Sequence, residues 1–185
     1  MLRIAITGNI ASGKSQVEKI LEDMGYVVYD SDKIAHEILE NITDFYGFDV
    51  FTNGKIDRKK LSTLVFGNPD LKKKLEEITH PKIKSKILEI FEQNKNEKFV
   101  FVSVPLLYEA GFEDIFDKVI FISVDKSTQL KRLIARNNFS EEEALLRINS
   151  QLCEEKKLQK ADFVIENNST IKELKAKTEQ IINLI

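Results

Sequence analysis

Five short runs of β-branched and aromatic residues recur along the chain, separated by stretches with helical periodicity. The runs are Leu2–Ile6, Tyr26–Tyr29, Lys98–Ser103, Lys118–Ser123 and Asp162–Ile165. Several of them are nearly uninterrupted apolar segments, which is typical of strands that are buried on both faces of a sheet. Strands joined by helical crossovers run parallel. The alternation therefore predicts an α/β fold with a five-stranded parallel sheet covered by helices on both faces.

The chain of 185 residues fits a single domain, 1–185, because domains hold roughly 150 residues. Two segments do not follow the alternation. The segment from about 40 to 97 contains helical stripes that are interrupted at His80-Pro81, and the segment from about 137 to 160 is charged and helical. Insertions at the loop ends of α/β proteins usually form the substrate pocket or a closing lid. We therefore expect a helical substrate-binding insertion at 40–97 and a lid at 137–160.

Charge and composition exclude several functions. The 28 basic and 30 acidic residues give a net charge of −2, which argues against a protein that grips nucleic acid over its whole surface. The single cysteine, Cys153, has no partner for an internal disulfide, and we expect it to be a small buried filler. The longest apolar stretch, Phe99–Leu107, is too short to span a bilayer, and no signal peptide is expected before Gly8, which only Met1–Thr7 precede. These features predict a cytoplasmic protein with neither a membrane nor a nucleic-acid partner.

The first run is followed at once by G-N-I-A-S-G-K-S, residues 8–15, which matches the phosphate-binding pattern G-x-x-x-x-G-K-[ST] and opens an amphipathic helix. Gly8 and Gly13 let the backbone turn so that successive N–H groups point at phosphate oxygens, and the helix N-terminus adds partial positive charge. Lys14 is expected to reach the β- and γ-phosphates, and the Ser15 hydroxyl to bind Mg²⁺. The predicted nucleotide-binding residues are Gly8, Asn9, Ile10, Ala11, Ser12, Gly13, Lys14, Ser15 and Gln16.

Other motifs narrow the type of reaction. A GTPase needs an Asn-Lys-x-Asp that reads guanine, and the nearest match, Asn94–Glu97, ends in Glu and precedes a strand. A motor ATPase needs a carboxylate at the end of a buried strand, where Ser103 stands. A small-molecule kinase needs a carboxylate beside the γ-phosphate, and Asp30 and Asp32 follow the second run. One of them is expected to act as general base and the other to bind Mg²⁺ or its water shell, with Asp32 favoured as the base. Alternatively, Asp30 or Ser31 caps the next helix.

Phosphoryl transfer also requires cations over the γ-phosphate. Arg132 and Arg136 are four residues apart, so they share one face of a helix that leads into the charged segment. The alternative is a solvated basic face. We favour a lid cation for Arg136 and leave both interpretations open for Arg132, Arg147 and Lys157.

Together these motifs are specific in their order. They are Thr7–Ser15, Asp30–Ala35, Gly54–Leu61, His80-Pro81, Val104–Glu109, and a lid signature of Gln129, Arg132, Arg136, Arg147, Gln151 and Lys157, followed by Asn167. In this order the chain resembles the dephospho-CoA kinase family over nearly its whole length. It departs from the family at Asn9 and Ala11, where glycines are usual. At Ala11 the backbone is either ordinary or slightly strained.

The resemblance implies a three-layer P-loop kinase fold and the phosphorylation of dephospho-CoA by ATP with Mg²⁺, as a monomer or weak homo-oligomer. It also implies roles for individual residues. Asp32 would be the general base for the ribose 3′-hydroxyl, Lys14 and Arg136 would stabilise the transferred phosphate, Ser15 and Asp30 would hold the metal, and Asp32, His80, Leu106 and Glu109 would contact the substrate. His80 is equally expected as a hydrogen bonder at a helix start. The alternatives are another small-molecule kinase, of nucleoside-monophosphate or shikimate type, and a non-catalytic nucleotide-binding regulator.

Overall fold

The computed structural model describes residues 1–40, 50–52, 55–66 and 68–185. It contains two compact units. The first consists of Met1–Asp30 and Asn94–Ile185, and the second of Ser31–Gln93. Part of the predicted insertion, 41–49, and Gly54 of the Gly54–Leu61 motif lie outside the described residues.

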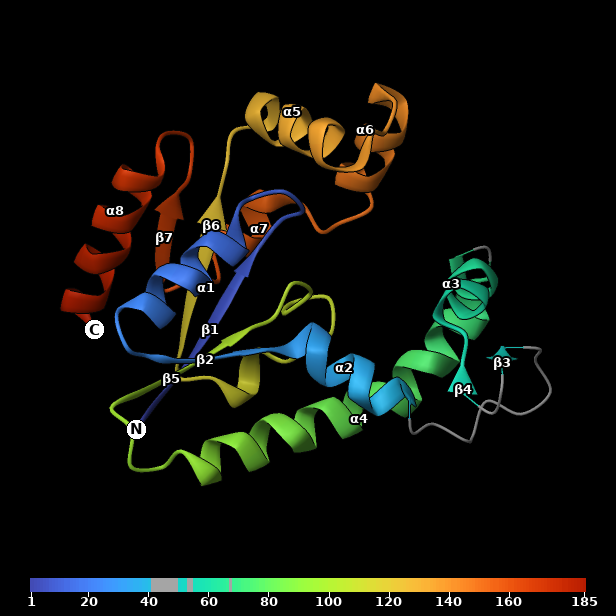
Figure 1. Ribbon diagram of the computed structural model, residues 1–185, viewed down its shortest axis with the longest axis horizontal. Helices are drawn as coiled ribbons and strands as arrows, with labels where there is room; N and C mark the ends of the chain where they lie inside the picture. The colour runs from blue at the N-terminus through green and yellow to red at the C-terminus, as the bar shows by residue number, and fades with distance from the viewer. Residues whose placement is uncertain (41–49, 53–54, 67) are drawn as a thin grey trace. The chain divides into compact units, whose positions relative to one another are not determined.

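The first unit is built on a single parallel sheet of five strands (Figure 1). Its strands are β1 (Leu2–Gly8), β2 (Val27–Asp30), β5 (Phe99–Ser103), β6 (Lys118–Ser123) and β7 (Phe163–Glu166), in the order β2-β5-β1-β6-β7. This confirms the α/β class and the five predicted strands. The central strand β1 pairs with β5 on one side and β6 on the other. The carboxyl end of β1, where the glycine motif begins, therefore lies between the ends of two neighbouring strands.

One face of this sheet carries the main hydrophobic core. Side chains that alternate along the strands meet residues of α1 (Lys14–Asp23) and α8 (Ile171–Leu184). The buried members of this cluster are Ile4, Ile6, Val17, Ile20, Leu21, Phe99, Phe101, Ile120, Ile122, Ile165, Leu174 and Ile182. Because α1 is anchored through this core, its N-terminus, and the loop before it, are held against the end of the sheet.

A 3₁₀ turn at Glu113–Ile115 precedes β6. Three helices follow that strand. They are α5 (Lys126–Asn137), α6 (Glu141–Asn149) and α7 (Glu154–Leu158). Asp125 caps α5 by accepting from the Thr128 N–H at 2.8 Å, and a capping box between Ser140 and Glu143 starts α6. Cys153 is exposed at the start of α7, so the prediction of a buried filler is wrong: the residue stands at a helix start that faces solvent.

The second unit contains α2 (Ser31–Glu40), a two-stranded antiparallel hairpin of β3 (Phe51–Thr52) and β4 (Lys55–Ile56), α3 (Arg58–Phe66) and α4 (Pro69–Gln93). A small cluster of Val50, Ile56 and Leu61 forms its core next to the hairpin. Across the described residues, no helix combines the length and apolar character needed to cross a membrane.

Helix α4 runs without a break through His80-Pro81, so the predicted interruption is wrong, and His80 does not lie at a helix start. Proline removes one backbone hydrogen bond and pushes away the carbonyl four residues earlier, but it does not always end a helix. The Thr79 hydroxyl donates to the Leu75 carbonyl at 2.8 Å. Beyond the proline, Ile83 and Ile87 are buried, and this apolar stripe stabilises the continued helix.

Candidate active site

The segment from Gly8 to Ser15 joins the carboxyl end of β1 to the N-terminus of α1, and both of its glycines are required by the local geometry. A Cβ atom on Gly8 would lie 2.6 Å from the Ile122 carbonyl oxygen. Gly13 has a φ of 89°, and a Cβ there would lie 2.1 Å from Nδ2 of Asn167. That amide nitrogen donates to the Ser12 carbonyl oxygen at 2.8 Å. The glycines therefore allow a backbone turn that Asn167 then ties to the end of β7.

The third position of tight backbone in this loop is Ala11, whose φ is 60°. Of the two possibilities that the sequence leaves open, the strained one is therefore correct, because a Cβ in the left-handed region is unfavourable. The Ser12 N–H donates to the Asn9 carbonyl oxygen at 3.0 Å and closes the turn around Ala11. Such strain persists only where the surrounding contacts hold it.

Lys14 points toward the end of β5. Its Nζ lies 3.1 Å from Oγ of Ser103 and 3.4 Å from Oε1 of Glu18. The Ser103 hydroxyl donates to the same Glu18 oxygen at 2.5 Å. Asp30, the last residue of β2, is in register with Ser103, so Asp30, the expected metal ligand, and Lys14, the lysine expected to bind phosphate, lie at the same end of the sheet. Sequence reasoning missed Glu18, although its i,i+4 spacing from Lys14 on α1 is the signal that would have found it.

The loop also fits an anionic ligand in two further respects. The Ser12 side chain is buried, and its Oγ has no hydrogen-bond partner within the described part of the chain. Ser15 is exposed in the first turn of α1, where a hydroxyl can reach a ligand at the helix N-terminus. Buried polar atoms are normally satisfied, so an unpaired hydroxyl within a glycine-rich turn at a helix N-terminus is consistent with a loop that binds an anion.

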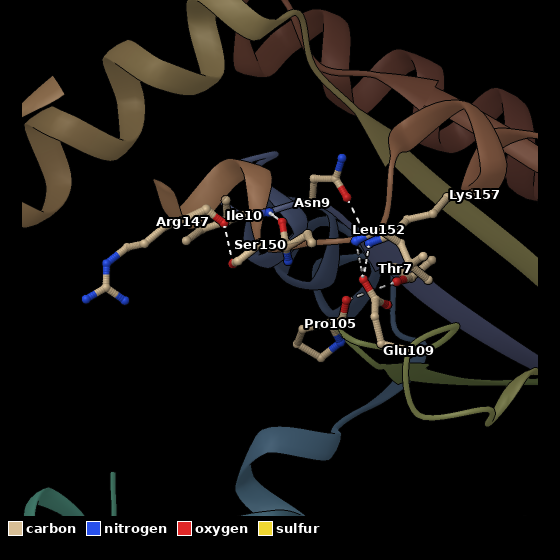
Figure 2. Close-up of polar contacts among 10 residues, drawn as sticks. Thr7, Asn9, Ile10, Pro105, Glu109, Arg147, Ser150, Leu152 and Lys157 are labelled. Atoms are coloured by element: carbon tan, nitrogen blue, oxygen red, sulfur yellow. Dashed lines mark hydrogen bonds and ion pairs between the residues drawn. The ribbon is translucent and has the colours of Figure 1, made fainter. Parts of the chain in front are cut away.

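Residues 9 and 10 are held by side chains that come from distant parts of the chain (Figure 2). The Ile10 N–H donates to Oε1 of Gln151 at 2.8 Å, and its carbonyl accepts from Nε2 of Gln129 at 2.9 Å. Nζ of Lys157 donates to Oδ1 of Asn9 at 2.9 Å. Helix α7, within the predicted lid, and helix α5, which leads into it, thus directly contact residues 8–15, here called the phosphate loop.

Glu109, which follows β5, belongs to the same group. Its Oε1 lies 2.6 Å from Nζ of Lys157 and accepts the Leu152 N–H at 3.2 Å. Burial raises the pKa of the Glu154 carboxyl on α7 and the charge of Glu155 raises it further, while the charges of Lys126 and Lys157 act in the opposite direction. The Glu109 carboxylate therefore has protein partners in the part of the chain that was expected to contact substrate.

The remaining predicted residues lie in different places. Arg136 is exposed in the last turn of α5, where its Nε donates to Oδ1 of Asn137 at 2.9 Å. Leu106 is 47% exposed in the turn after β5. Asp32 lies in the first turn of α2, and His80 lies within α4; both belong to the second unit. Within the first unit, the structure thus brings together residues 8–15, which include Lys14, and Ser103, which is in register with Asp30.

Comparisons with known proteins identify the family and the fold of this chain. A family model described as Dephospho-CoA kinase matches residues 2–173. A curated relative of that name from Fusobacterium nucleatum is 42% identical, with 98% of this chain and 97% of the relative covered. The solved structure of dephospho-CoA kinase from Campylobacter jejuni is 38% identical with a TM-score of 0.76, covering 98% of this chain and 95% of that one. A shikimate kinase from Bacteroides thetaiotaomicron shares the fold at 15% identity, with a TM-score of 0.63 over 99% of this chain and 97% of that one.

Proposed function

The chain belongs to the dephospho-CoA kinase family, and from this premise we propose that it transfers the γ-phosphoryl group of ATP to the ribose 3′-hydroxyl of dephospho-CoA. The observation that carries the proposal is the family match over residues 2–173. The turn with its buried, unpaired Ser12 hydroxyl supports it independently, because this arrangement suits a triphosphate at a helix N-terminus.

The nucleotide is assigned to residues 8–16. The backbone N–H groups of the turn would bind phosphate oxygens, and Lys14 would exchange its contacts with Ser103 and Glu18 for the β- and γ-phosphates. Ser15 and Asp30 would hold Mg²⁺, for which hydroxyl and carboxylate oxygens are suitable ligands. When bound, the metal neutralises the charge that develops on the phosphate oxygens.

The transfer requires a base, an acceptor and a cation that stabilises the negative charge of the transferred phosphoryl group. The 3′-oxygen of dephospho-CoA attacks the γ-phosphorus, the bond from that phosphorus to the β,γ-bridging oxygen breaks, and ADP leaves. Asp32 would accept the hydroxyl proton, and Arg136 would stabilise the phosphoryl oxygens. His80, Leu106 and Glu109 are proposed contacts of the substrate, with 40–97 as the substrate-binding insertion and 137–160 as the lid.

A coupled assay of ADP release tests this function directly. The purified protein is given ATP and one acceptor at a time: dephospho-CoA, a nucleoside monophosphate or shikimate, each with Mg²⁺ and with EDTA. We expect release that depends on dephospho-CoA and on Mg²⁺. Release stimulated by a nucleoside monophosphate or by shikimate, and not by dephospho-CoA, would refute the proposal. Tight ATP binding without turnover on any acceptor would instead indicate a nucleotide-binding regulator.

A further inference from the structure

Lys157 contacts the phosphate loop. Among the charged side chains that do so in the described part of the first unit, it is the most deeply buried. Its side chain is 1% exposed, and its Nζ lies 2.6 Å from Oε1 of Glu109 and 2.9 Å from Oδ1 of Asn9. An ammonium group offers three donors and no acceptor. Here a carboxylate oxygen and an amide oxygen accept two of these donors, so the buried ammonium group is paired. With its charge neutralised inside the protein, Lys157 is unsuited to the role of mobile cation over the γ-phosphate, which the sequence had left open.

A buried ion pair is weak evidence for a stabilising role, because the loss of hydration offsets much of the attraction between the charges. Its position gives a better account of its presence. Lys157 lies on α7, Glu109 follows β5, and Asn9 is the second residue of the phosphate loop. The two atoms that Lys157 joins are thus 100 residues apart in the chain (109 − 9), and one of them belongs to the turn that is expected to bind ATP.

The neighbouring contacts act on the same part of the turn. The Asn9 side-chain amide is engaged from α7, where Lys157 donates to its Oδ1. The next peptide group is held through Gln151 at the Ile10 N–H. Immediately after these two residues comes Ala11, with its unfavourable φ of 60°. A strained residue keeps its conformation only when its neighbours are fixed, and these contacts fix the two residues before it.

We propose that Lys157 is a positioning residue for the kinase reaction: by binding Asn9 and Glu109 together, it fixes the start of the phosphate loop in the conformation that binds the triphosphate. The inference rests on the proposed function, in that ATP is taken to bind at residues 8–16. It assigns Lys157 no contact with ATP, so its effect should appear in nucleotide affinity through Asn9.

The test compares Lys157→Met with Lys156→Met, which alters an exposed lysine one residue earlier on the same helix. ATP affinity is measured by calorimetry without acceptor, and KM for ATP and kcat by ADP release. We expect Lys157→Met to weaken ATP binding and raise KM for ATP by about 10- to 100-fold, the usual effect of losing a hydrogen bond from a charged group. Lys156→Met should leave both unchanged. Wild-type affinity in Lys157→Met would overturn the proposal.

A second variant separates positioning from stability, because Lys157→Met alone leaves the partly exposed Glu109 carboxylate without its ion-pair partner. In Lys157→Met/Glu109→Gln both charges are gone, so the thermal unfolding midpoint should return toward that of the wild type. ATP affinity should stay about 10- to 100-fold reduced, since Asn9 still lacks its donor. Adding Asn9→Ala should then cause no further loss, because Lys157 acts through Asn9. Recovery of ATP affinity together with stability would show that the pair is structural only.

The two proposals fail in different ways. If the wild type binds ATP but does not phosphorylate dephospho-CoA, the proposed function is wrong, and the role of Lys157 is still judged from ATP affinity. If the wild type phosphorylates dephospho-CoA and Lys157→Met does so with unchanged KM for ATP, the positioning role is wrong and the function stands.

Discussion

At the scale of single residues, the phosphate loop depends on contacts that leave no room for a side chain. Gly13 has the left-handed backbone of a glycine, and its missing Cβ makes space for Asn167. Asn167 uses that space to bind the Ser12 carbonyl. Gly25 has a similar φ of 87°, but no atom lies within 4 Å of the position that its Cβ would take. The two glycines therefore differ in crowding and hardly at all in φ.

This difference gives a matched pair of variants. Gly25→Ala should lower the free energy of unfolding by about 1–2 kcal/mol, the cost of a left-handed non-glycine residue, and leave ATP affinity unchanged. Gly13→Ala should have the same backbone cost and should also displace Asn167 from the loop. ATP affinity should therefore fall by at least about 10-fold, the effect of losing one hydrogen bond. Urea unfolding and ATP titration of both variants provide the check. Equal ATP affinities in the two would mean that the Asn167 contact does not shape the loop.

The two aspartates after β2 give a second prediction at this scale. Asp32→Asn should slow turnover by about 10²–10⁴-fold, the usual contribution of a general base, with ATP affinity nearly unchanged. Asp30→Asn should instead raise the Mg²⁺ concentration needed for half-maximal activity, because Asp30 is the proposed metal ligand. Single-turnover kinetics and Mg²⁺ titrations of both variants distinguish these roles. If Asp32→Asn abolished ATP binding while Asp30→Asn slowed the chemistry, the two roles would be exchanged.

At the scale of elements, helix α5 carries Gln129 and Arg136 and begins at a well-defined cap. The Asp125 carboxylate accepts from the hydroxyl of Ser127 and from both the N–H and the hydroxyl of Thr128. These hydrogen bonds lower the pKa of Asp125 to about 2. The folded protein therefore holds this carboxylate in its charged form at a pH where an unfolded chain, with a pKa near 3.9, has begun to take up a proton.

The sign of the resulting pH dependence follows from linkage. A pKa that is lower in the folded state stabilises the protein above about pH 4, and this contribution is lost as the pH falls toward 2. Asp125→Asn keeps a capping amide oxygen but does not titrate. We expect the unfolding midpoint of the wild type to exceed that of the variant at pH 7, with the difference shrinking between about pH 4 and pH 2. A difference that stays constant over this range would show that the charge of Asp125 does not contribute.

Most of these elements are predictable from the sequence, and the exceptions have physical causes. The strands are evident because runs such as Lys118–Ser123 are apolar on both faces. The hairpin of β3 and β4 escapes because each strand has only two residues, too few for a periodicity. The full length of helix α4 is not predictable because a proline usually indicates a helix boundary. Here the buried apolar stripe after Pro81 continues the helix.

At the scale of the whole molecule, sequence patterns predict which residues bind phosphate but not what holds them in place. The glycine motif is one continuous segment of the chain, so phosphate binding can be inferred from it without a structure. Lys157 contacts Asn9 across 148 residues, and Asn167 contacts Ser12 across 155. Contacts of this kind depend on the order β2-β5-β1-β6-β7, which no local pattern encodes.

The most direct test of the whole account is the identity of the product. The full chain is incubated with ATP, Mg²⁺ and dephospho-CoA, and the mixture is analysed by mass spectrometry and ³¹P NMR. The account predicts coenzyme A, with one new phosphate monoester on the ribose 3′-oxygen, and ADP in equal amount. ADP formed by hydrolysis with dephospho-CoA left intact, or a phosphate attached at any other position, would contradict it.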